Sequence, residues 1–107
     1  MMAKKTELSL TSQASIIMCT YNGAKFISEQ LSSILNGTVV PKYVYIFDWG
    51  SNDKTIKILE GFISDSNNVE IVLIKRDEPV GACDSFLWAF EYTLKIDNTS
   101  DYFFLCD

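Results

Sequence analysis

The chain has 107 residues, of which 48 % are hydrophobic and 13 % aromatic, and it carries a formal net charge of −5. This length and apolar content fit one small domain with a single core and exclude a disordered chain. The acidic balance, with scattered basic residues, excludes a binder of nucleic-acid phosphates, and the absence of histidine excludes Ser-His-Asp and Cys-His catalytic pairs and the commonest zinc sites.

The N-terminal residues 1–14 are predicted to form a frayed tail. They include two lysines but no apolar stretch with a small-residue cleavage site, so no secretion signal is expected. No apolar run in the chain approaches the ~20 residues of a membrane-spanning helix. The cysteines Cys19, Cys83 and Cys106 are odd in number and form no CxxC pair, which indicates reduced thiols in the cytoplasm.

The first strand and helix are predicted within residues 15–37. The apolar segment Ser15–Cys19 predicts a strand, and the following Thr20-Tyr21-Asn22-Gly23 contains Asn-Gly, a strong turn signal. The period then changes to that of a helix, with apolar residues on one face at Ile27, Leu31, Ile34 and Leu35. Gly37 stands where the glycine that follows a helix is expected.

The second strand and helix are predicted within residues 43–63. Tyr43–Phe47 is rich in aromatic and β-branched residues, which favour a strand. This apolar run ends abruptly in Asp48, and a large indole, Trp49, follows the acid. Asp53 is predicted to be the N-cap of a helix that has Ile56, Leu59 and Ile63 on one face.

The third strand is predicted at Val69–Ile74, after a polar turn at residues 64–68. Pro79 and Gly81 then break the chain before a third helix. This helix is predicted to be capped by Asp84 or Ser85 and to face the core with Leu87, Phe90 and Leu94. A polar loop at residues 97–100 precedes a fourth strand at residues 102–106.

The element order β-α-β-α-β-α-β predicts an α/β fold with a doubly wound, mainly parallel four-stranded sheet and helices on both faces. The strands read as continuous apolar runs, which is typical of a parallel sheet covered on both sides. Ligands of such sheets bind at the carboxyl ends of the strands. Neither GxGxxG nor GxxxxGK[ST] occurs in the chain, which weighs against a dinucleotide or P-loop site.

The residues directly after the strands offer carboxylates, a tyrosine, amides and hydroxyls. Asp48 follows the second strand and Asp107 follows the fourth. A carboxylate can accept hydrogen bonds from a nucleobase or a ribose, Tyr21 can stack on a base, and hard oxygen ligands suit Mg²⁺ or Mn²⁺. Taken alone, an aspartate after a strand is more often a turn former or a helix cap than a ligand, and Tyr21 is equally explained as an edge aromatic.

The order of these segments resembles the N-terminal, donor-binding half of a family 2 glycosyltransferase of the GT-A fold. The resemblance rests on TYN after the first strand, DWGSNDKT after the second, Gly81 before a helix, and YFFLCD at the end. The last segment is most similar to the bacterial rhamnosyltransferase-type branch. The resemblance implies a Rossmann-like, nucleotide-sugar-binding domain at residues 15–107 that stops at the start of the D-x-D metal motif.

The resemblance also implies which residues bind the nucleotide-sugar donor: Cys19, Thr20, Tyr21, Asn22, Asp48, Trp49, Ser51, Asp84 and Ser85. Tyr21 matches the segment that lines the base, and Asp48 matches the first acid of the D-D-G-S motif. Asp84 and Ser85 match a helix start near the phosphates and the sugar. Asp107 matches the first acid of D-x-D, which implies a metal ligand for the Mg²⁺ or Mn²⁺ of the parent enzyme.

Three departures from the family pattern bear on these expectations. Trp49 replaces the second acid of D-D-G-S, and an indole has no oxygen to accept the imide hydrogen of a base, so its ring is expected to stack or to turn into a protein contact. Pro79 and Ser85 stand where the family has asparagines. The chain ends at Asp107, before further metal ligands and a catalytic base, so the 107-residue chain is expected to be inactive and to bind no cation.

The leading hypothesis is a parent enzyme that transfers a sugar to a glycan acceptor for bacterial surface polysaccharide, in the cytoplasm or at the cytoplasmic face of the membrane. Its catalytic residues are not identified. A receiver-like or flavodoxin-like domain is disfavoured, because Cys19-Thr20 and Lys75-Arg76 stand where a receiver has its acids.

The alternative hypothesis is a degenerate, non-catalytic nucleotide-binding module that acts through self-association. An apolar face left uncovered would favour a homodimer. Four aromatic residues are the candidates for that contact, although core positions explain them as well: Phe103, Phe104, Trp88 and Tyr92.

Overall fold

The computed structural model describes residues 14–37, 41–66, 69–76, 82–97, 99–100 and 102–106. Within these ranges the elements follow the predicted order β-α-β-α-β-α-β. Their bounds are β1 Ala14–Thr20, α1 Ile27–Leu35, β2 Tyr43–Trp49, α2 Thr55–Asp65, β3 Glu70–Arg76, α3 Ala82–Ile96 and β4 Tyr102–Cys106. The predicted tail reaches one residue too far, because Ala14 is a buried strand residue whose carbonyl accepts a 2.7 Å hydrogen bond from the Lys42 amide.

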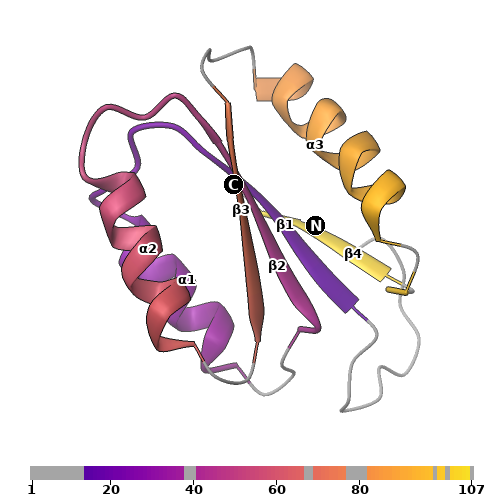
Figure 1. The fold of residues 1–107 in the computed structure, drawn as a ribbon, viewed down its shortest axis with the longest axis horizontal. Coiled ribbons are helices and arrows are strands. Elements are labelled where there is room, and N and C mark those ends of the chain that lie inside the picture. Colours follow the sequence, from indigo (N-terminus) through magenta and orange to yellow (C-terminus); the bar gives the residue numbers. More distant parts are fainter. Residues whose placement is uncertain are drawn as a thin grey trace.

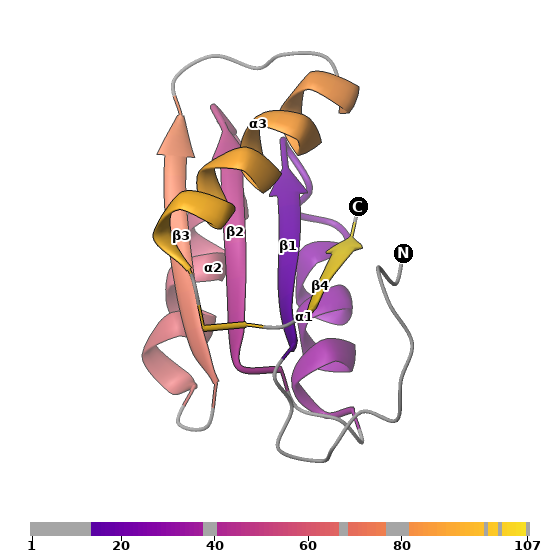
Figure 2. The ribbon, with the colours of Figure 1, turned by 90° about the vertical axis from the view of Figure 1, so that its right-hand side faces the viewer.

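The sheet has the strand order β3-β2-β1-β4, and every pair of neighbouring strands is parallel. All four arrows therefore point the same way in Figure 2, with β1 and β2 in the middle. The first two strands run further than predicted because their ladder continues past the apolar residues: Thr20 pairs with Asp48, and Trp49 pairs with Arg76 of β3. The predicted α/β fold class is confirmed.

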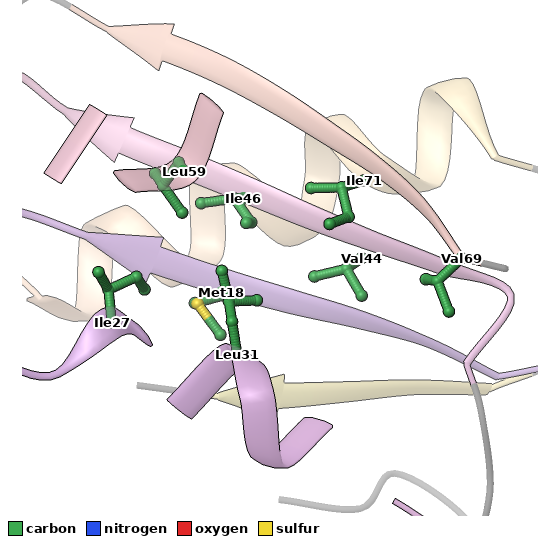
Figure 3. Packing of buried hydrophobic residues seen from close by; sticks show 8 residues of the cluster. All are labelled: Met18, Ile27, Leu31, Val44, Ile46, Leu59, Val69 and Ile71. Carbon is green, nitrogen blue, oxygen red and sulfur yellow. The ribbon is translucent and has the colours of Figure 1, made fainter. Parts of the chain in front are cut away.

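Helices cover both faces of the sheet: α1 and α2 pack on one face and α3 on the other (Figure 1). Under α1 and α2, alternate strand residues meet the apolar stripes of the two helices (Figure 3). The members of this core are Met18, Ile27, Leu31, Val44, Ile46, Leu59, Val69 and Ile71. The predicted apolar face of α1 is confirmed, since Ile27 and Leu31 are buried and Ile34 and Leu35 pack against them.

The core under α3 is built differently, because its large side chains come mostly from the strands. Tyr45, Phe47 and Trp49 are buried there, while the described side chains of α3 that are buried are small: Ser85, Ala89 and Thr93. Small helix residues let the helix approach the bulky strand face closely without overpacking it.

This arrangement makes the predicted inner face of α3 wrong in two positions. Leu87 is 57 % exposed and Leu94 is 49 % exposed, whereas Phe90 does pack against the core. The buried stripe consists instead of residues four apart, and apolarity alone did not reveal it because two of its members are hydroxyl residues. The buried hydroxyl of Thr93 is satisfied, since it donates to the Ala89 carbonyl at 2.7 Å.

The helix boundaries correct two predicted caps. Because α3 begins at Ala82, Asp84 lies inside its first turn and Ser85 faces the sheet, so neither residue is the cap. For α2 the N-cap residue is Lys54 rather than Asp53, although Asp53 still accepts the Thr55 amide at 2.9 Å. Gly37 follows the C-cap Asn36 of α1, as predicted. No helix among the described residues is long and apolar enough to cross a membrane.

A buried polar cluster ties the end of α3 to the sheet near the amino ends of the strands. The carboxylate of Asp97, 6 % exposed, accepts hydrogen bonds from the Tyr45 hydroxyl at 2.7 Å and from the amides of Thr99 and Ser100. Ser100 also bonds through its hydroxyl to Asp97 and to Ser15 of β1. The sequence predicted only a polar loop here; the structure shows that the loop folds around one acid.

Ionisation within this cluster is coupled. Burial acts to raise the pKa of Asp97, but the hydrogen bonds from Tyr45, Thr99 and Ser100 outweigh it and hold that pKa well below its usual range. Burial, and then the hydrogen bond to Asp97, raise the pKa of Tyr45 above that of an ordinary tyrosine. The pair is therefore a carboxylate bonded to a neutral phenol at neutral pH.

Candidate functional site: the carboxyl edge of β1 and β2

Asp48 organises the loop that follows β2. It is 2 % exposed, and its Oδ1 accepts hydrogen bonds from the hydroxyls of Thr20 at 2.7 Å and Ser51 at 2.6 Å. Its Oδ2 accepts the Ser51 amide at 2.9 Å. This turn back onto the acid requires Gly50, whose φ of 83° lies in the left-handed region where a side chain would be strained.

Asn22 and Ser51 join the loop after β1 to the loop after β2. The backbone N–H of Asn22 donates to the Ser51 hydroxyl at 2.8 Å, and the side-chain oxygen of Asn22 accepts the backbone N–H of Asn52 at 2.8 Å. Asn22 reaches both partners from a left-handed backbone conformation with φ 51°, which asparagine tolerates better than most residues. Asp48 thereby acts on the first loop through Ser51.

A third tie fixes the start of α1 to the start of α2. The Gly23 amide donates to the Thr55 hydroxyl at 2.9 Å, and the Ala24 amide donates to Asp53 Oδ2 at 3.2 Å. The Gly23 carbonyl in turn accepts the amides of Phe26 and Ile27, both at 3.0 Å. The hydrogen bonds from Thr55 and Ala24 lower the pKa of Asp53, which favours its charged form.

These three ties are called the loop clasp here, and its members are Thr20, Asn22, Gly23, Asp48, Ser51, Asp53 and Thr55. The predicted site residues Thr20, Asn22, Asp48 and Ser51 are thus brought together. Asp53 and Thr55 were missed as site residues, although both belong to the DWGSNDKT segment; only the contact of Gly23 with Thr55 shows that they hold the first loop.

Tyr21 projects from the clasp into solvent. Its side chain is 52 % exposed, while Thr20 before it is hydrogen-bonded to Asp48 of β2 and Asn22 after it to Ser51 of the second loop. The backbone that carries the ring is therefore held from both sides. An exposed aromatic ring on a fixed loop at a strand end can stack on a flat ligand with little loss of conformational entropy.

Trp49 turns away from this edge into the protein. Alternation along β2 places it on the α3 face, where it is 4 % exposed and meets the Trp88 ring edge-on with 5.4 Å between centroids. Of the two alternatives predicted for the indole, the structure shows the protein contact; a contact with a donor stays a prediction. Among the described residues, no partner accepts a hydrogen bond from the Trp49 Nε1.

Replacing Trp49 with phenylalanine tests what that indole nitrogen costs. An unpaired buried N–H costs about 1–3 kcal/mol, so Trp49→Phe should lose less than about 1 kcal/mol of unfolding free energy, whereas Trp49→Ala should lose about 3–5 kcal/mol. Urea unfolding of both variants checks this. Equal losses in the two variants would mean that the indole nitrogen is stabilised after all.

The other predicted site residues lie on the α3 side of the sheet or outside the described part of the chain. Cys19 is a half-buried, reduced thiol on the α3 face of β1. Asp84 is exposed and Ser85 buried, both in the first turns of α3 on the face opposite α1 and α2. Asp107 lies outside the described residues.

The described residues do not fit a divalent cation. Within those ranges no group of three or more His, Cys, Asp or Glu side chains could hold a metal ion, and Asp48 already uses both oxygens in the clasp. What the edge can do is hold an exposed ring and polar loop groups in a fixed arrangement.

Comparison with known proteins gives consistent matches. The family model for glycosyl transferase family 2 matches residues 15–107. An uncharacterized glycosyltransferase of Haemophilus influenzae is 33 % identical over 58 residues, which is 54 % of this chain and 18 % of that protein.

A solved structure shows the same fold. The mannosyltransferase PcManGT from Pyrobaculum calidifontis, in complex with GDP-Man and Mn2+, superimposes with a TM-score of 0.67 at 22 % identity, over 84 % of this chain and 28 % of that one. The chain thus spans less than a third of either relative. The rhamnosyltransferase-type branch stays a prediction. On its sequence, and in agreement with its GT-A-like fold, the chain belongs to glycosyl transferase family 2.

Proposed function

We propose that this chain is the donor-binding part of a glycosyltransferase that moves a sugar from a nucleotide-diphosphate donor to a glycan or polysaccharide acceptor, for bacterial surface polysaccharide. The observation that carries the proposal is the loop clasp beneath Tyr21, at the carboxyl edge of β1 and β2. The chain belongs to glycosyl transferase family 2, and ligands of parallel α/β sheets bind at this edge.

Tyr21 is the proposed platform for the nucleobase. Stacking of a base on an aromatic ring contributes about 1–3 kcal/mol, and the clasp removes most of the cost of ordering the loop. Asn22 follows Tyr21 in the chain, and its backbone N–H donates to the Ser51 hydroxyl; the polar side chains of both residues offer hydrogen bonds to a ribose. Asp48 holds these groups in place rather than meeting the ligand itself, because it is buried and bonded.

The proposal assigns donor binding, and not transfer, to the 107-residue chain. Transfer in this family needs a cation to offset the charge of the departing diphosphate and a base aligned with the acceptor hydroxyl. The described residues supply no set of metal ligands, and the chain covers 28 % of the mannosyltransferase that was solved with Mn2+. The whole enzyme is proposed to use Mg²⁺ or Mn²⁺.

Titration with nucleoside diphosphates tests the proposal. UDP, dTDP and GDP, each with and without Mn²⁺, are added to the purified chain and followed by changes in amide NMR signals. At least one is expected to bind with a Kd of about 1 mM, or about 4 kcal/mol, with little dependence on Mn²⁺. Absence of any binding contradicts the proposal, and micromolar binding that requires Mn²⁺ contradicts the division between donor binding and metal binding.

A matched pair of variants locates the base. Tyr21→Ala should weaken the same titration about fivefold or more, whereas Phe26→Ala should leave it unchanged. Phe26 is a suitable control because it is another exposed aromatic residue, 69 % exposed, at the start of α1. Equal effects of the two variants would contradict a platform at Tyr21.

A second candidate, a non-catalytic nucleotide-binding module that self-associates, is favoured by one observation. Three large apolar residues of α3 are about half exposed: Leu87, Leu94 and Ile96. The aromatic residues that the sequence predicts for this contact are mostly internal, since Phe103 is buried and Trp88 and Tyr92 pack against the core. The side chain of Phe104 lies outside the described ones.

Light scattering distinguishes the two candidate functions: a dimer that Leu87→Glu dissociates supports association, and a monomer at all concentrations contradicts it.

The proposed location is the cytoplasm, or the cytoplasmic face of the membrane for the whole protein. Support comes from the odd number of cysteines in the chain and the reduced Cys19 thiol. Fractionation of cells that express a tagged chain tests this, and recovery from the periplasm would contradict it.

A further inference from the structure

A guanidinium is held in place at the carboxyl end of β3. Arg76 is the residue opposite Trp49 in the ladder between β2 and β3. Its guanidinium carbon lies 4.4 Å from the centroid of the Trp88 ring and 5.9 Å from that of Trp49. Trp88 is itself stacked on Tyr92, with centroids 5.0 Å apart and an angle of 18° between the rings. The two indoles therefore fix the guanidinium, although Arg76 is exposed.

Tyr21, Trp49 and Arg76 stand in one row across the sheet. The ladder between β1 and β2 ends one residue before Tyr21 and Trp49, so these two are level at the edge. Alternation places the row on the α3 side: Trp49 and Arg76 contact Trp88, and Cys19, two residues before Tyr21, packs in the core under α3. Two strand spacings, about 10 Å, separate the backbones at the two ends of the row.

The strand order indicates which part of a donor lies beside Arg76. The proposed cation ligand of the whole enzyme, Asp107, follows β4, and β1 separates β4 from β2 and β3. A donor whose diphosphate lies toward β4 and whose base stacks on Tyr21 therefore extends its base toward the ends of β2 and β3. At the end of β3, Arg76 is on the side of the base and away from the phosphates.

The two side chains that follow Tyr21 in this row donate hydrogen bonds and accept none. Arg76 has five N–H donors and Trp49 has one, and neither has an acceptor. Among the described residues, the contacts of Arg76 are the two indoles rather than a carboxylate. Because the indoles cover a face of the guanidinium, the N–H groups around its edge remain available to a ligand. A base beside them is recognised through its acceptor atoms.

Guanine fits this row of donors best. Its O6 and N7 are adjacent acceptors, the pair that an arginine commonly meets through two parallel N–H groups. Adenine has an amino donor in place of O6, and uracil and thymine have an N–H between their two carbonyls. Cytosine has adjacent acceptors in N3 and O2, but its O2 adjoins the ribose.

We propose that Arg76 recognises the nucleobase of the donor and selects guanine, and that Trp49 and Trp88 are positioning residues for its guanidinium. The inference rests on the proposed donor-binding function and names the base that the same site takes. The indole at position 49 contributes in two ways: it supports the guanidinium, and it brings no carboxylate to the base edge or to Arg76.

Nucleotides that differ only in the base test the selection. GDP, inosine diphosphate, 7-deaza-GDP, ADP, CDP and UDP are titrated into the full chain and followed by NMR. GDP and inosine diphosphate should bind alike, since both have O6 and N7. Each should bind about tenfold more tightly than ADP, CDP or UDP. 7-deaza-GDP lacks N7 and should lose most of this preference.

Variants of the two neighbouring cations assign the selection to one side chain. Arg76→Met keeps an unbranched chain over the indoles but removes the donors, so it should weaken GDP binding about tenfold and leave ADP and UDP binding unchanged. Lys75→Met is the matched control, because it removes the same charge from the end of the same strand and alternation places it on the opposite face. It should keep the preference for GDP, and Arg76→Lys should keep only part of it because a lysine lacks two parallel N–H groups.

Trp88→Leu tests the positioning of the guanidinium. This variant keeps the charge of Arg76 but removes the ring beneath it, so the ratio of GDP affinity to ADP affinity should fall at unchanged ADP affinity. A purely structural role of Trp88 would lower both affinities together. The Nε–H signal of Arg76 in the unchanged chain should shift with GDP and not with ADP.

Three results would overturn the inference: GDP binding no tighter than that of ADP, CDP or UDP, equal effects of Arg76→Met and Lys75→Met, or an equal loss of all nucleoside diphosphates in Arg76→Met. The last result would mean that Arg76 acts on the diphosphate or on the fold rather than on the base. If the unchanged chain binds no nucleoside diphosphate, the proposed function fails. That outcome is distinct from binding without a preference among bases, which contradicts the inference alone.

Discussion

Asp48→Ala is expected to lose about 3 kcal/mol of unfolding free energy and to abolish the binding of nucleoside diphosphates. The variant leaves the Thr20 hydroxyl and the Ser51 amide without the buried acceptor that each now has. The Ser51 hydroxyl also accepts a hydrogen bond from the backbone N–H of Asn22. Once Asp48 no longer holds Ser51, the loop that carries Tyr21 is therefore no longer held either. Urea unfolding measures the first effect and the NMR titration measures the second.

Asp48→Asn separates the charge of this residue from its geometry. The hydroxyls of Thr20 and Ser51 can rotate to accept from an amide nitrogen at the Oδ1 position, while the amide oxygen still accepts the Ser51 N–H. This variant should therefore lose only about 1 kcal/mol and retain nucleotide binding. Glu60→Ala, at an exposed position of α2, is the control and should stay within about 0.5 kcal/mol of the unchanged chain. Nucleotide binding by Asp48→Ala at full affinity would show that the clasp does not organise the site.

Asp97→Ala is expected to lose about 4 kcal/mol of unfolding free energy. The substitution removes the acceptor of the Tyr45 hydroxyl and of the amides of Thr99 and Ser100 at once. These groups are buried or partly buried, so water replaces the lost bonds incompletely. Tyr45→Phe removes one bond and should lose about 1.5 kcal/mol, and thermal unfolding followed by circular dichroism compares the two.

The pH dependence of stability distinguishes the loss of the Asp97–Tyr45 pair from the loss of packing alone. The folded-state pKa of Asp97 lies below its unfolded value of about 4, so its contribution is present above about pH 4 and is lost as the pH falls further. The pKa of Tyr45 is raised above its unfolded value of about 10, so its contribution is present below about pH 10 and is lost above it. Asp97→Asn should flatten the acid limb and Tyr45→Phe the alkaline limb; unchanged limbs would show that the pair does not stabilise the fold.

The amino-acid sequence is enough to predict the succession of strands and helices along the chain and the edge of the sheet that carries a site. Apolar runs, turn residues and helical spacing are local signals, and in a parallel sheet they imply that all the strands end on one edge. For this reason the sequence predicts Thr20, Asn22, Asp48 and Ser51, which follow the first two strands, as site residues, and the structure brings them together.

The role of each of those residues depends on contacts between segments that are far apart in the chain. Whether Asp48 meets a ligand or holds a loop depends on the Thr20 and Ser51 hydroxyls that surround it, and whether Trp49 stacks on a base depends on the space beneath Trp88. The inner face of α3 was mispredicted for the same reason: large strand side chains fill that core, so the helix turns Ser85, Ala89 and Thr93 toward the sheet and leaves Leu87 and Leu94 outside. Side-chain volume and hydrogen bonding between segments far apart in the chain are not local properties, and they become known only when the segments are packed together.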